Sequence, residues 1–304
     1  MSLAGRARLV ADRALDALGN FANDHGRLAE WQRDRFWAQA RKRTSLVCVE
    51  GAAGVRYLVR PKDPHISQAI IRTGAFEPDK IARVLSLLRT EGISVDQLLD
   101  VGANIGTTSI EVLRLLPDIR AVAFEPEPDN YRILRMNLIA NGLEDRVRTH
   151  QIALSDTTAS LTFELSSYNP GDNRVRYGEP SHNVFGEERW HTIQVPALPL
   201  DDVQDLDVTD NTLIYMDVQG HEGQVLAGAR RVLEQRPPLA MELWPYGLER
   251  ADGLELFLDR HSGYQRIFDT TSDPPREISH QLLRPLAEHV AREPWGVAEI
   301  LAVH

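Results

Sequence analysis

The sequence predicts an α/β protein in which a mostly parallel sheet is covered by helices on both faces. From residue 97 onward, apolar segments of strand length alternate with segments of helix length, a pattern typical of parallel strands buried on both faces. The chain has 304 residues, of which 42% are hydrophobic, so it is long enough to bury a large core. Its single cysteine, Cys48, excludes an intramolecular disulfide and a cysteine-based zinc site.

The first 43 residues differ from the rest of the chain in charge. They carry a net charge of +4 within a chain of net charge −10, and they are rich in Ala, Leu and Arg without Pro, which predicts helices. Trp31, Phe36 and Trp37 offer aromatic faces for docking on the main body or on a partner. We therefore predict a helical extension over residues 1–45, which could form a homo-oligomer contact, and one main domain over residues 46–304.

The elements of the main domain follow in order. Residues 46–60 predict two short strands about a Gly-rich turn, and a helix begins at Pro78, with apolar residues at helical spacing through residue 88. The strands that follow are predicted within residues 97–106, 121–128, 146–154, 212–220, 238–245, 263–269 and 296–304, and the helices within 107–116, 129–141, 221–235 and 249–261.

Charge and hydropathy exclude several classes of protein. An acidic main domain is unsuited to a nucleic-acid binder that neutralises phosphates. No run of about 18 apolar residues predicts a membrane-spanning helix, and the N-terminus lacks the apolar core of a signal peptide. The expected location is the cytoplasm.

The first candidate site is the turn after the strand that ends at Asp100. Gly102 and Gly106 enclose Asn104, and the glycines allow a tight turn with close approach of a ligand to the backbone. Asn104 stands where a dinucleotide-binding turn has its second glycine. The carboxylate of Asp100 suits a cationic ammonium group better than a pyrophosphate. A tight turn without a ligand is the alternative.

Two further acids follow the next strands. Glu125, followed by Pro126, ends a strand 25 positions after Asp100, where a carboxylate can accept hydrogen bonds from both hydroxyls of a ribose. The alternative is a solvated acid beside a helix start. Asp156 follows the third strand and is suited to an adenine amino group, or it belongs to an ordinary turn.

The densest group of titratable residues follows the fourth strand. Asp217, His221 and Glu222 fall within six residues at a strand-to-helix turn, where this fold class places its active site. The alternative is a capping aspartate with two exposed polar residues.

The segments LLDVGANIGTTSI, AFEPEPDNYRILRMNLIAN, ALSD and YMDVQGHEGQVLAGA occur in this order and resemble S-adenosylmethionine-dependent methyltransferases of the FkbM type. The resemblance extends from about Tyr57 to Trp244. It implies a Rossmann-like class I methyltransferase fold, with a seven-stranded, mostly parallel sheet that ends in an antiparallel C-terminal hairpin. It also implies O-methylation of a sugar or secondary-metabolite hydroxyl with S-adenosyl-L-methionine as cofactor. The implied cofactor-binding residues are Glu77, Asp100, Gly102, Asn104, Gly106, Glu125, Pro126, Asp156 and Asp217.

A hydroxyl acceptor has to lose a proton during methyl transfer. His221 is the first candidate for the general base, because an unperturbed imidazole titrates near neutrality. Asp217 would orient His221 or bind the acceptor, and Glu222 is the second candidate base. Asp217 and Glu222 could instead hold a divalent ion, but no pattern requires one, and we predict no metal.

Residues 157–199 interrupt the alternation of strands and helices, and we predict that they form a substrate lid. Polar and aromatic side chains in this insertion could contact a polyhydroxylated small molecule or a glycan. These candidate substrate-binding residues are Tyr168, Asn169, Asp172, Asn173, Arg174, His182, Trp190 and His191, and a flexible insertion without function is the alternative.

Two other functions fit the fold class. An NAD-dependent oxidoreductase would use the same kind of sheet, although the second glycine of its turn is missing. A non-catalytic cofactor-binding scaffold, assembled through the N-terminal helices, is the other alternative.

Overall fold

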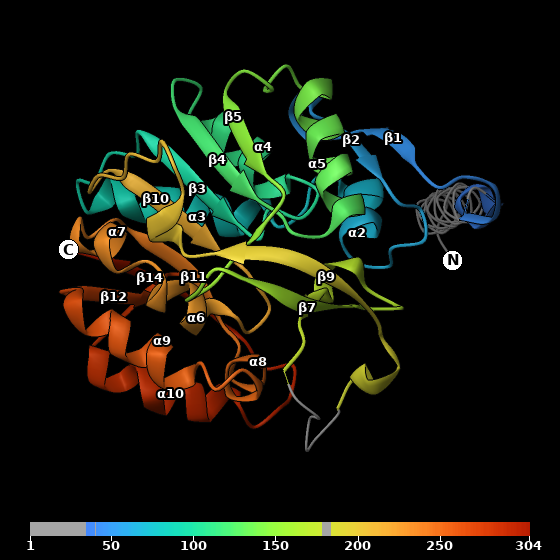
Figure 1. Ribbon diagram of the computed structural model, residues 1–304. Helices are drawn as coiled ribbons and strands as arrows, with labels where there is room; N and C mark the ends of the chain where they lie inside the picture. The colour runs from blue at the N-terminus through green and yellow to red at the C-terminus, as the bar shows by residue number, and fades with distance from the viewer. Residues whose placement is uncertain (1–34, 40, 178–183) are drawn as a thin grey trace, which may run out of the picture. The chain divides into compact units, whose positions relative to one another are not determined.

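The computed structural model describes residues 35–39, 41–177 and 184–304 (Figure 1). Two compact units divide the chain: the segment ending at Val47 together with Arg60–Lys62, and Cys48–Val59 together with Asp63–His304. Within the first unit, residues 35–39 and 41–43 are helical, and the rings of Phe36 and Trp37 meet edge to face at 5.1 Å. Residues 1–34 and 40 of the predicted N-terminal extension, Trp31 among them, lie outside the described residues.

A large mixed sheet forms the centre of the second unit. Its strand order is β13-β12-β14-β11-β10-β3-β4-β5, and the five strands from β11 to β5 run parallel, whereas β14, β12 and β13 pair antiparallel. The strands are β3 (Gln97–Val101), β4 (Arg120–Phe124), β5 (Val147–His150), β10 (Thr212–Met216), β11 (Leu239–Leu243), β12 (Arg266–Asp269), β13 (Arg276–Ile278) and β14 (Ala298–Val303). The predicted α/β fold with a mostly parallel sheet is confirmed.

The sheet differs from the prediction in one strand. We predicted seven strands, whereas β13 adds an eighth strand at the edge beside β12. The segment that contains it, TSDPPREIS, combines two prolines with charged residues, and prolines disfavour a strand prediction although edge strands tolerate them.

Helices cover both faces of this sheet (Figure 1). Prolines at the first helical position of α3 and α5 fit the fixed φ of that position, and Glu127 caps α5 by accepting hydrogen bonds from the amides of Asp129 and Asn130. The helices are α2 (Ile66–Thr73), α3 (Pro78–Thr90), α4 (Thr107–Leu115), α5 (Pro128–Ala140), α6 (Glu222–Ala227), α7 (Arg230–Glu234), α8 (Pro245–Arg250), α9 (Leu254–Arg260) and α10 (Leu283–Val290).

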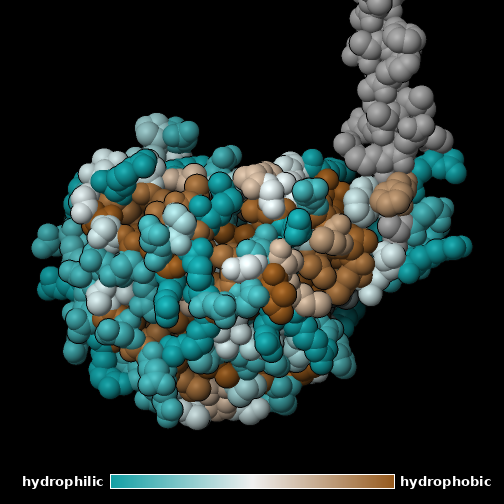
Figure 2. Space-filling view, turned by 90° about the horizontal axis from the view of Figure 1, so that it is seen from above, coloured by the Kyte–Doolittle hydropathy of each residue, from teal (hydrophilic) through white to brown (hydrophobic). Residues whose placement is uncertain are grey.

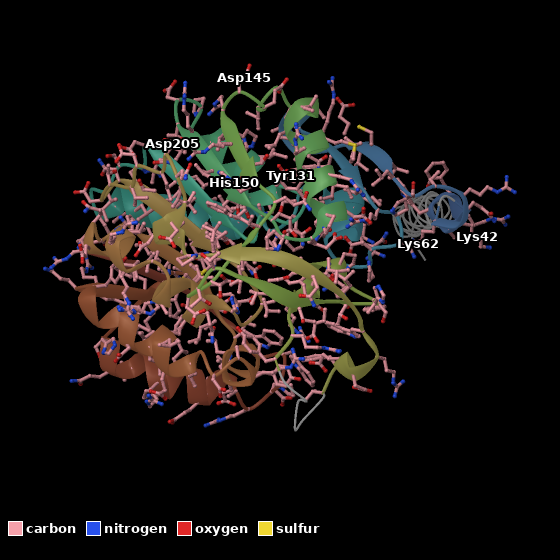
Figure 3. The ribbon with its side chains drawn as sticks, in the orientation of Figure 1. Lys42, Lys62, Tyr131, Asp145, His150 and Asp205 are labelled. Atoms are coloured by element: carbon pink, nitrogen blue, oxygen red, sulfur yellow. The ribbon has the colours of Figure 1, made fainter. Side chains whose placement is uncertain are left out.

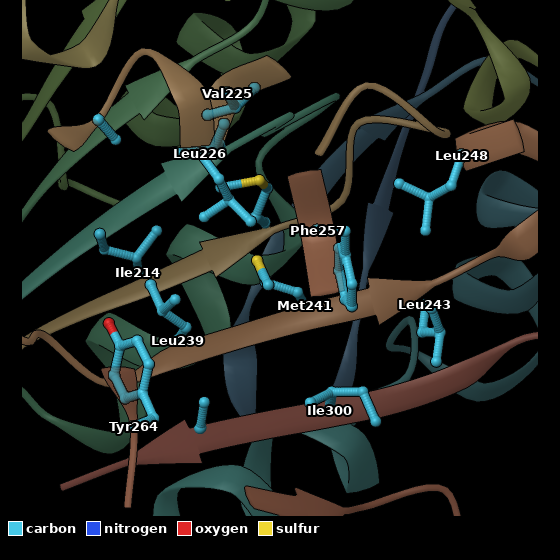
Figure 4. Close-up of a cluster of buried hydrophobic side chains, with 14 of the residues drawn as sticks. Ile214, Val225, Leu226, Leu239, Met241, Leu243, Leu248, Phe257, Tyr264 and Ile300 are labelled. Atoms are coloured by element: carbon cyan, nitrogen blue, oxygen red, sulfur yellow. The ribbon is translucent and has the colours of Figure 1, made fainter. Parts of the chain in front are cut away.

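The two faces of the sheet carry different residues at its centre. Ile214, Leu239, Met241, Leu243 and Ile300 point to one face, where they pack against apolar residues of α6, α8 and α9 (Figure 4). Side chains alternate between faces along a strand, so the neighbours of these residues along each strand point to the other face. Glu242 and Glu299, which are discussed below, are among these neighbours.

A second sheet occupies most of the insertion between β5 and β10. Its strand order is β6-β9-β7-β8, and its bounds are β6 (Ala153–Leu154), β7 (Ala159–Leu165), β8 (Arg174–Val175) and β9 (His191–Leu198). Within the predicted lid over residues 157–199, β7 and β9 pair over seven residues and pack a small core around Phe163 and Val195. The described part of this segment is therefore largely a sheet, and its role as a substrate lid stays a prediction.

A smaller hairpin is attached to the main sheet through α5. β1 (Val47–Glu50) pairs with β2 (Arg56–Val59). The buried side chain of Asn137 accepts a hydrogen bond from the Leu58 amide at 2.6 Å and donates to the carbonyl oxygens of Leu58 and Ile105. One amide side chain therefore joins β2, α5 and the glycine loop.

The outer surface of α5 and its neighbours is mixed in polarity. Tyr131 of α5 lies beside the end of β5, where its hydroxyl is 3.0 Å from the Thr149 hydroxyl (Figure 3). Seen from above, hydrophobic and hydrophilic residues are interspersed on this side (Figure 2). In the described ranges, no helix is long and apolar enough to cross a bilayer.

Candidate active site

A pocket of about 540 Å³ opens at the carboxyl ends of β3, β4 and β10, the edge at which open α/β sheets bind their ligands. Residues of α2 and α3 form one wall, and the turn between β7 and β8 forms another. The volume falls within the usual range of small-molecule sites.

The glycine loop after β3 forms the pocket floor. Asp100 is buried, and its carboxylate accepts hydrogen bonds from the amide and the hydroxyl of Ser109 at 3.0 and 2.5 Å. Burial raises the pKa of Asp100 to about 6, although both hydrogen bonds oppose the shift. Gly102 has φ of 87°, and a Cβ there would overlap the backbone oxygen of Asp217. Glycine is therefore required where the loops after β3 and β10 meet.

Glu125 holds the loop from the neighbouring strand. Its two carboxylate oxygens accept hydrogen bonds from the amides of Asn104 and Glu127, each at 2.8 Å. Burial raises the pKa of Glu125 to about 8. The pocket lining includes Glu125, Asn104 and Pro126. The Glu125 carboxyl group therefore both stabilises the glycine loop and lines the pocket.

Asp217 lies directly after β10, and its side chain is exposed and lines the pocket. Its carboxylate accepts a 2.6 Å hydrogen bond from the Gln219 amide group. Protein atoms nevertheless crowd it from several sides, and this desolvation raises the pKa of Asp217. The exposed area therefore faces the pocket, where an acceptor molecule could reach it.

His221 lines the same pocket but is almost fully buried. One ring nitrogen, Nδ1, is hydrogen-bonded to the Tyr177 hydroxyl, and Nε2 lies 3.0 Å from the Ser155 hydroxyl. A neutral ring satisfies both contacts by accepting at one nitrogen and donating at the other. Burial lowers the pKa of His221 to about 4, so the ring is a weak base whose nitrogens are both engaged.

Glu222 does not belong to the pocket lining. It is fully buried, and its Oε1 atom accepts hydrogen bonds from the amides of Val218 and Gly220 at 3.0 and 3.4 Å. Burial raises its pKa to about 7. Glu222 was the second candidate base, and the structure places it outside the pocket lining, where its carboxylate accepts hydrogen bonds within the turn after β10. The described residues also contain no cluster suited to a metal ion.

Four charged residues extend the pocket beyond Asp217. The Lys80 ammonium group is 2.9 Å from the Glu77 carboxylate and 2.6 Å from the Glu299 carboxylate, and Glu242 lies in register with Glu299 on the neighbouring strand. All four line the pocket. Of these four residues, only Glu77 was predicted. Glu242 and Glu299 were not predicted, because the pairing of β11 with β14 joins residues 57 positions apart and no local pattern shows it.

The predicted substrate residues of the insertion divide into two groups. Asn169, Asp172 and Asn173 line the pocket from the turn between β7 and β8. Tyr168 lies beside them and is 70% exposed, and its ring meets the pocket residue His65 edge to face at 5.6 Å.

Three other predicted substrate residues, Arg174, Trp190 and His191, do not line the pocket, so these predictions are corrected. Arg174 is buried in ion pairs with Glu164 and Glu187, and Trp190 covers its guanidinium group at 4.6 Å. His191 is exposed on β9 and lies outside the lining. The position of His182 lies outside the described residues.

Asp156, predicted to bind adenine, is exposed and also lies outside the pocket lining. Its carboxylate accepts a hydrogen bond from the Ser155 hydroxyl at 3.1 Å. Apolar residues occupy this side of the pocket instead, among them Pro126, Ile152 and Phe163, and they offer flat surfaces for a planar base.

The sequence matches the model of the methyltransferase FkbM domain over residues 100–265, which include the glycine loop, Glu125 and Asp217. The chain belongs to the FkbM methyltransferase family. The predicted family is therefore confirmed, and with it the predicted cofactor, S-adenosyl-L-methionine.

Individual relatives of this FkbM-family chain are methyltransferases. It is 31% identical over 147 residues to 2-O-methyltransferase NoeI of Sinorhizobium fredii. This alignment covers 45% of this chain and 58% of NoeI. It is 28% identical over 146 residues to Methyltransferase 1 of Beauveria bassiana, covering 43% of this chain and 57% of that protein. The match thus spans less than two thirds of either relative. Among solved structures, P. horikoshii TYW2 in complex with MeSAdo is 13% identical with a TM-score of 0.41, over 85% of this chain and 70% of that chain.

The residues of the pocket fit the cofactor of this family. The carboxyl groups of Asp100 and Glu125 line the pocket and are of the kind that an ammonium group and a ribose diol require. The apolar side beside Pro126 and Ile152 suits an adenine ring. The lining is therefore compatible with the ammonium group, the ribose and the adenine of S-adenosyl-L-methionine.

Proposed function

We propose that this FkbM-family protein transfers a methyl group from S-adenosyl-L-methionine to a hydroxyl group of a sugar or secondary-metabolite acceptor. The observation that carries the proposal is the Asp217 carboxylate, which is open to the pocket directly beside the glycine loop. The name of the relative NoeI, a 2-O-methyltransferase, supports oxygen as the acceptor atom.

The chain would contribute alignment and proton removal to this reaction. Bound S-adenosyl-L-methionine supplies an electrophilic methyl group, and Asp100, Glu125 and the glycine loop would hold the cofactor in place. Exclusion of water and alignment of the two reactants supply much of the acceleration in such a displacement. The proton of the acceptor hydroxyl would pass to the Asp217 carboxylate, whose raised pKa makes it a stronger base than an ordinary aspartate.

Asp217 is a better candidate for the base than His221. The His221 nitrogens are both hydrogen-bonded within the protein and its pKa is lowered to about 4. His221 would instead position the loop after β10, because its ring is hydrogen-bonded to Tyr177 and Ser155, which follow strands β8 and β6 of the second sheet.

Polar groups of the insertion would bind the acceptor. Asn169, Asp172 and Asn173 line the pocket, and the exposed Tyr168 ring offers a flat surface of the kind on which sugar rings stack. The acidic lining disfavours a polyanion, so we expect a small-molecule or glycan acceptor rather than a nucleic acid. Cytoplasmic location and a homo-oligomer contact through the N-terminal segment remain predictions.

The test begins with the cofactor and continues with the acceptor. Calorimetry should show binding of S-adenosylhomocysteine and no binding of NADH, which would contradict the oxidoreductase alternative. Methyl transfer is then measured as S-adenosylhomocysteine formation with methyl glycosides, phenols and amines as acceptors. Transfer to amines alone, or NADH binding without S-adenosylhomocysteine binding, would refute the proposal.

Two variants then separate the candidate bases. Asp217→Asn should lower kcat about 10²–10⁴-fold, the usual contribution of a general base, while the Kd of S-adenosylhomocysteine changes less than about threefold. His221→Ala should retain the dependence of kcat on pH that the wild type shows near neutrality, and it should lose thermal stability. A larger loss of kcat in His221→Ala than in Asp217→Asn would return the role of base to His221.

A further inference from the structure

Three carboxylates stand side by side at one end of the sheet. Glu242 pairs in register with Glu299, and Met241 pairs with Met216, the residue before Asp217. Paired residues on neighbouring strands share a face, and Asp217, Glu242 and Glu299 all line the pocket. We refer to these three residues as the carboxylate row.

The charge of the carboxylate row is only partly neutralised. Lys80 forms ion pairs with Glu299 and with Glu77, so one ammonium group serves two carboxylates. Asp217 is bound by the neutral amide of Gln219. Within the described part of the chain, no hydrogen bond or ion pair reaches the carboxylate of Glu242. Within the described residues, Asp217 and Glu242 therefore have no paired cation, and a bound cation would favour the ionised form of both carboxyl groups.

The carboxylate row begins at the part of the pocket assigned to the methionine end of the cofactor. The amide of Asp217 donates a 3.0 Å hydrogen bond to the carbonyl oxygen of Val101, and its own backbone oxygen lies against Gly102. Glu242 and Glu299 follow on the next two strands, away from the glycine loop. A positive charge near the methionine sulfur would thus face the row.

We propose that the carboxylate row makes the pocket select S-adenosyl-L-methionine over S-adenosylhomocysteine by charge. The first ligand carries a positively charged sulfonium, whereas the second, its product, has a neutral thioether, and the two share every other charged group. Charges that face each other in a partly buried pocket interact strongly enough to change an affinity about tenfold. The neutral product would then leave the pocket more readily than the substrate. The inference rests on the cofactor of the proposed function and not on its acceptor.

Titration of the row supports this proposal. Desolvation raises the pKa values of Asp217, Glu242 and Glu299, repulsion from Asp217 adds to the shifts of Glu242 and Glu299, and Lys80 opposes all three shifts. A cationic ligand would lower these pKa values again and release protons. The charged groups that act on Glu242 are Asp217 after β10, Glu299 of β14, Glu222 of α6 and Lys80 of α3.

Calorimetry of the full chain tests the proposal without an acceptor. The Kd values of S-adenosyl-L-methionine and S-adenosylhomocysteine are measured near neutral pH for the wild type, Glu242→Gln and the control Glu111→Gln. Glu111 is another buried glutamate, but it pairs with Arg114 outside the pocket lining. We expect the wild type to favour the cationic ligand about tenfold. Glu242→Gln should lower this preference with little change in the Kd of S-adenosylhomocysteine, and the control should keep the preference of the wild type.

A second measurement uses only the wild type and therefore does not depend on the folding of a variant. Because protonation removes the charge of the row, the preference for the cationic ligand should decrease as the pH falls from about 8 to 5.5. S-adenosyl-L-methionine binding should also release more protons than S-adenosylhomocysteine binding, as measured in buffers of different ionisation enthalpy. Equal wild-type affinities, or a preference unchanged in Glu242→Gln, would overturn the inference alone. Failure to bind either ligand would contradict the proposed function as well.

Discussion

Replacement of Glu222 by glutamine tests the assignment of this residue to the fold rather than to the reaction. The Glu222 carboxylate is fully buried, one of its oxygens accepts two backbone hydrogen bonds, and the other has no partner in the described structure. A glutamine side chain has the same shape and keeps one oxygen as an acceptor for Val218 and Gly220. Glu222→Gln should therefore fold normally and lose only the ionisable group.

The expected effect follows from the pKa of Glu222, which burial raises from 4.5 to about 7. Between these two pH values the folded protein holds a proton that the unfolded chain has released, so wild-type stability falls as the pH rises. A shift of this size corresponds to about 3 kcal/mol. The free energy of unfolding of Glu222→Gln, relative to the wild type, should therefore increase by about 3 kcal/mol between pH 4.5 and 8.

The assay is urea unfolding of both proteins at several pH values across this range. Other buried acids, such as Asp100 and Glu125, titrate in both proteins, so the difference between the two profiles isolates Glu222. Glu111→Gln is the control, because it removes an ion pair with Arg114 and should lower stability at neutral pH by up to about 1 kcal/mol. Parallel pH profiles for the wild type and Glu222→Gln would refute the reasoning.

Two further substitutions test how the pocket is built. Gly102→Ala should destabilise the protein by at least about 3 kcal/mol and abolish S-adenosylhomocysteine binding, because the new Cβ would overlap the Asp217 backbone at a φ of 87°. Thermal unfolding measures the loss of stability, and calorimetry measures the loss of binding. A Kd equal to that of the wild type would contradict the close contact. Asn137→Ala should lower the free energy of unfolding by about 2–4 kcal/mol, because it leaves backbone groups of Leu58 and Ile105 without partners. Urea unfolding measures this loss. A change in the free energy of unfolding below about 1 kcal/mol would contradict the prediction.

The parts of the molecule that could be predicted from the sequence are those determined locally. The strands around Asp100 and Glu125 and the turn at Asp217 follow from apolar runs, glycines and acids within a few residues of one another. The carboxyl ends of parallel strands meet at one edge, so the order of strands and helices along the chain is enough to assign these residues to one site. The structure places Asp100, Glu125 and Asp217 in one pocket.

The parts that could not be predicted depend on pairing between distant segments. Glu299 faces Glu242 only because β14 inserts between β11 and β12, which no local pattern specifies. The surroundings of His221 come from Tyr177 and Ser155, 44 and 66 residues away. An imidazole with two partners is indistinguishable in sequence from one free to act as a base. The prediction for Arg174 was wrong for the same reason, since its partners Glu164 and Glu187 lie on other segments of the insertion.

The pocket takes its walls from two sheets with separate cores, and this division has an evolutionary consequence. The cofactor side is formed by loops of the main sheet, whereas Asn169, Asp172 and Asn173 lie on a turn of the second sheet. Under the proposed function, mutations in that turn would alter the acceptor side while the hydrogen bonds of Asp100 and Glu125 stay intact. A lineage with this architecture would then acquire new acceptors by changes in a single hairpin, with the methyl donor retained throughout.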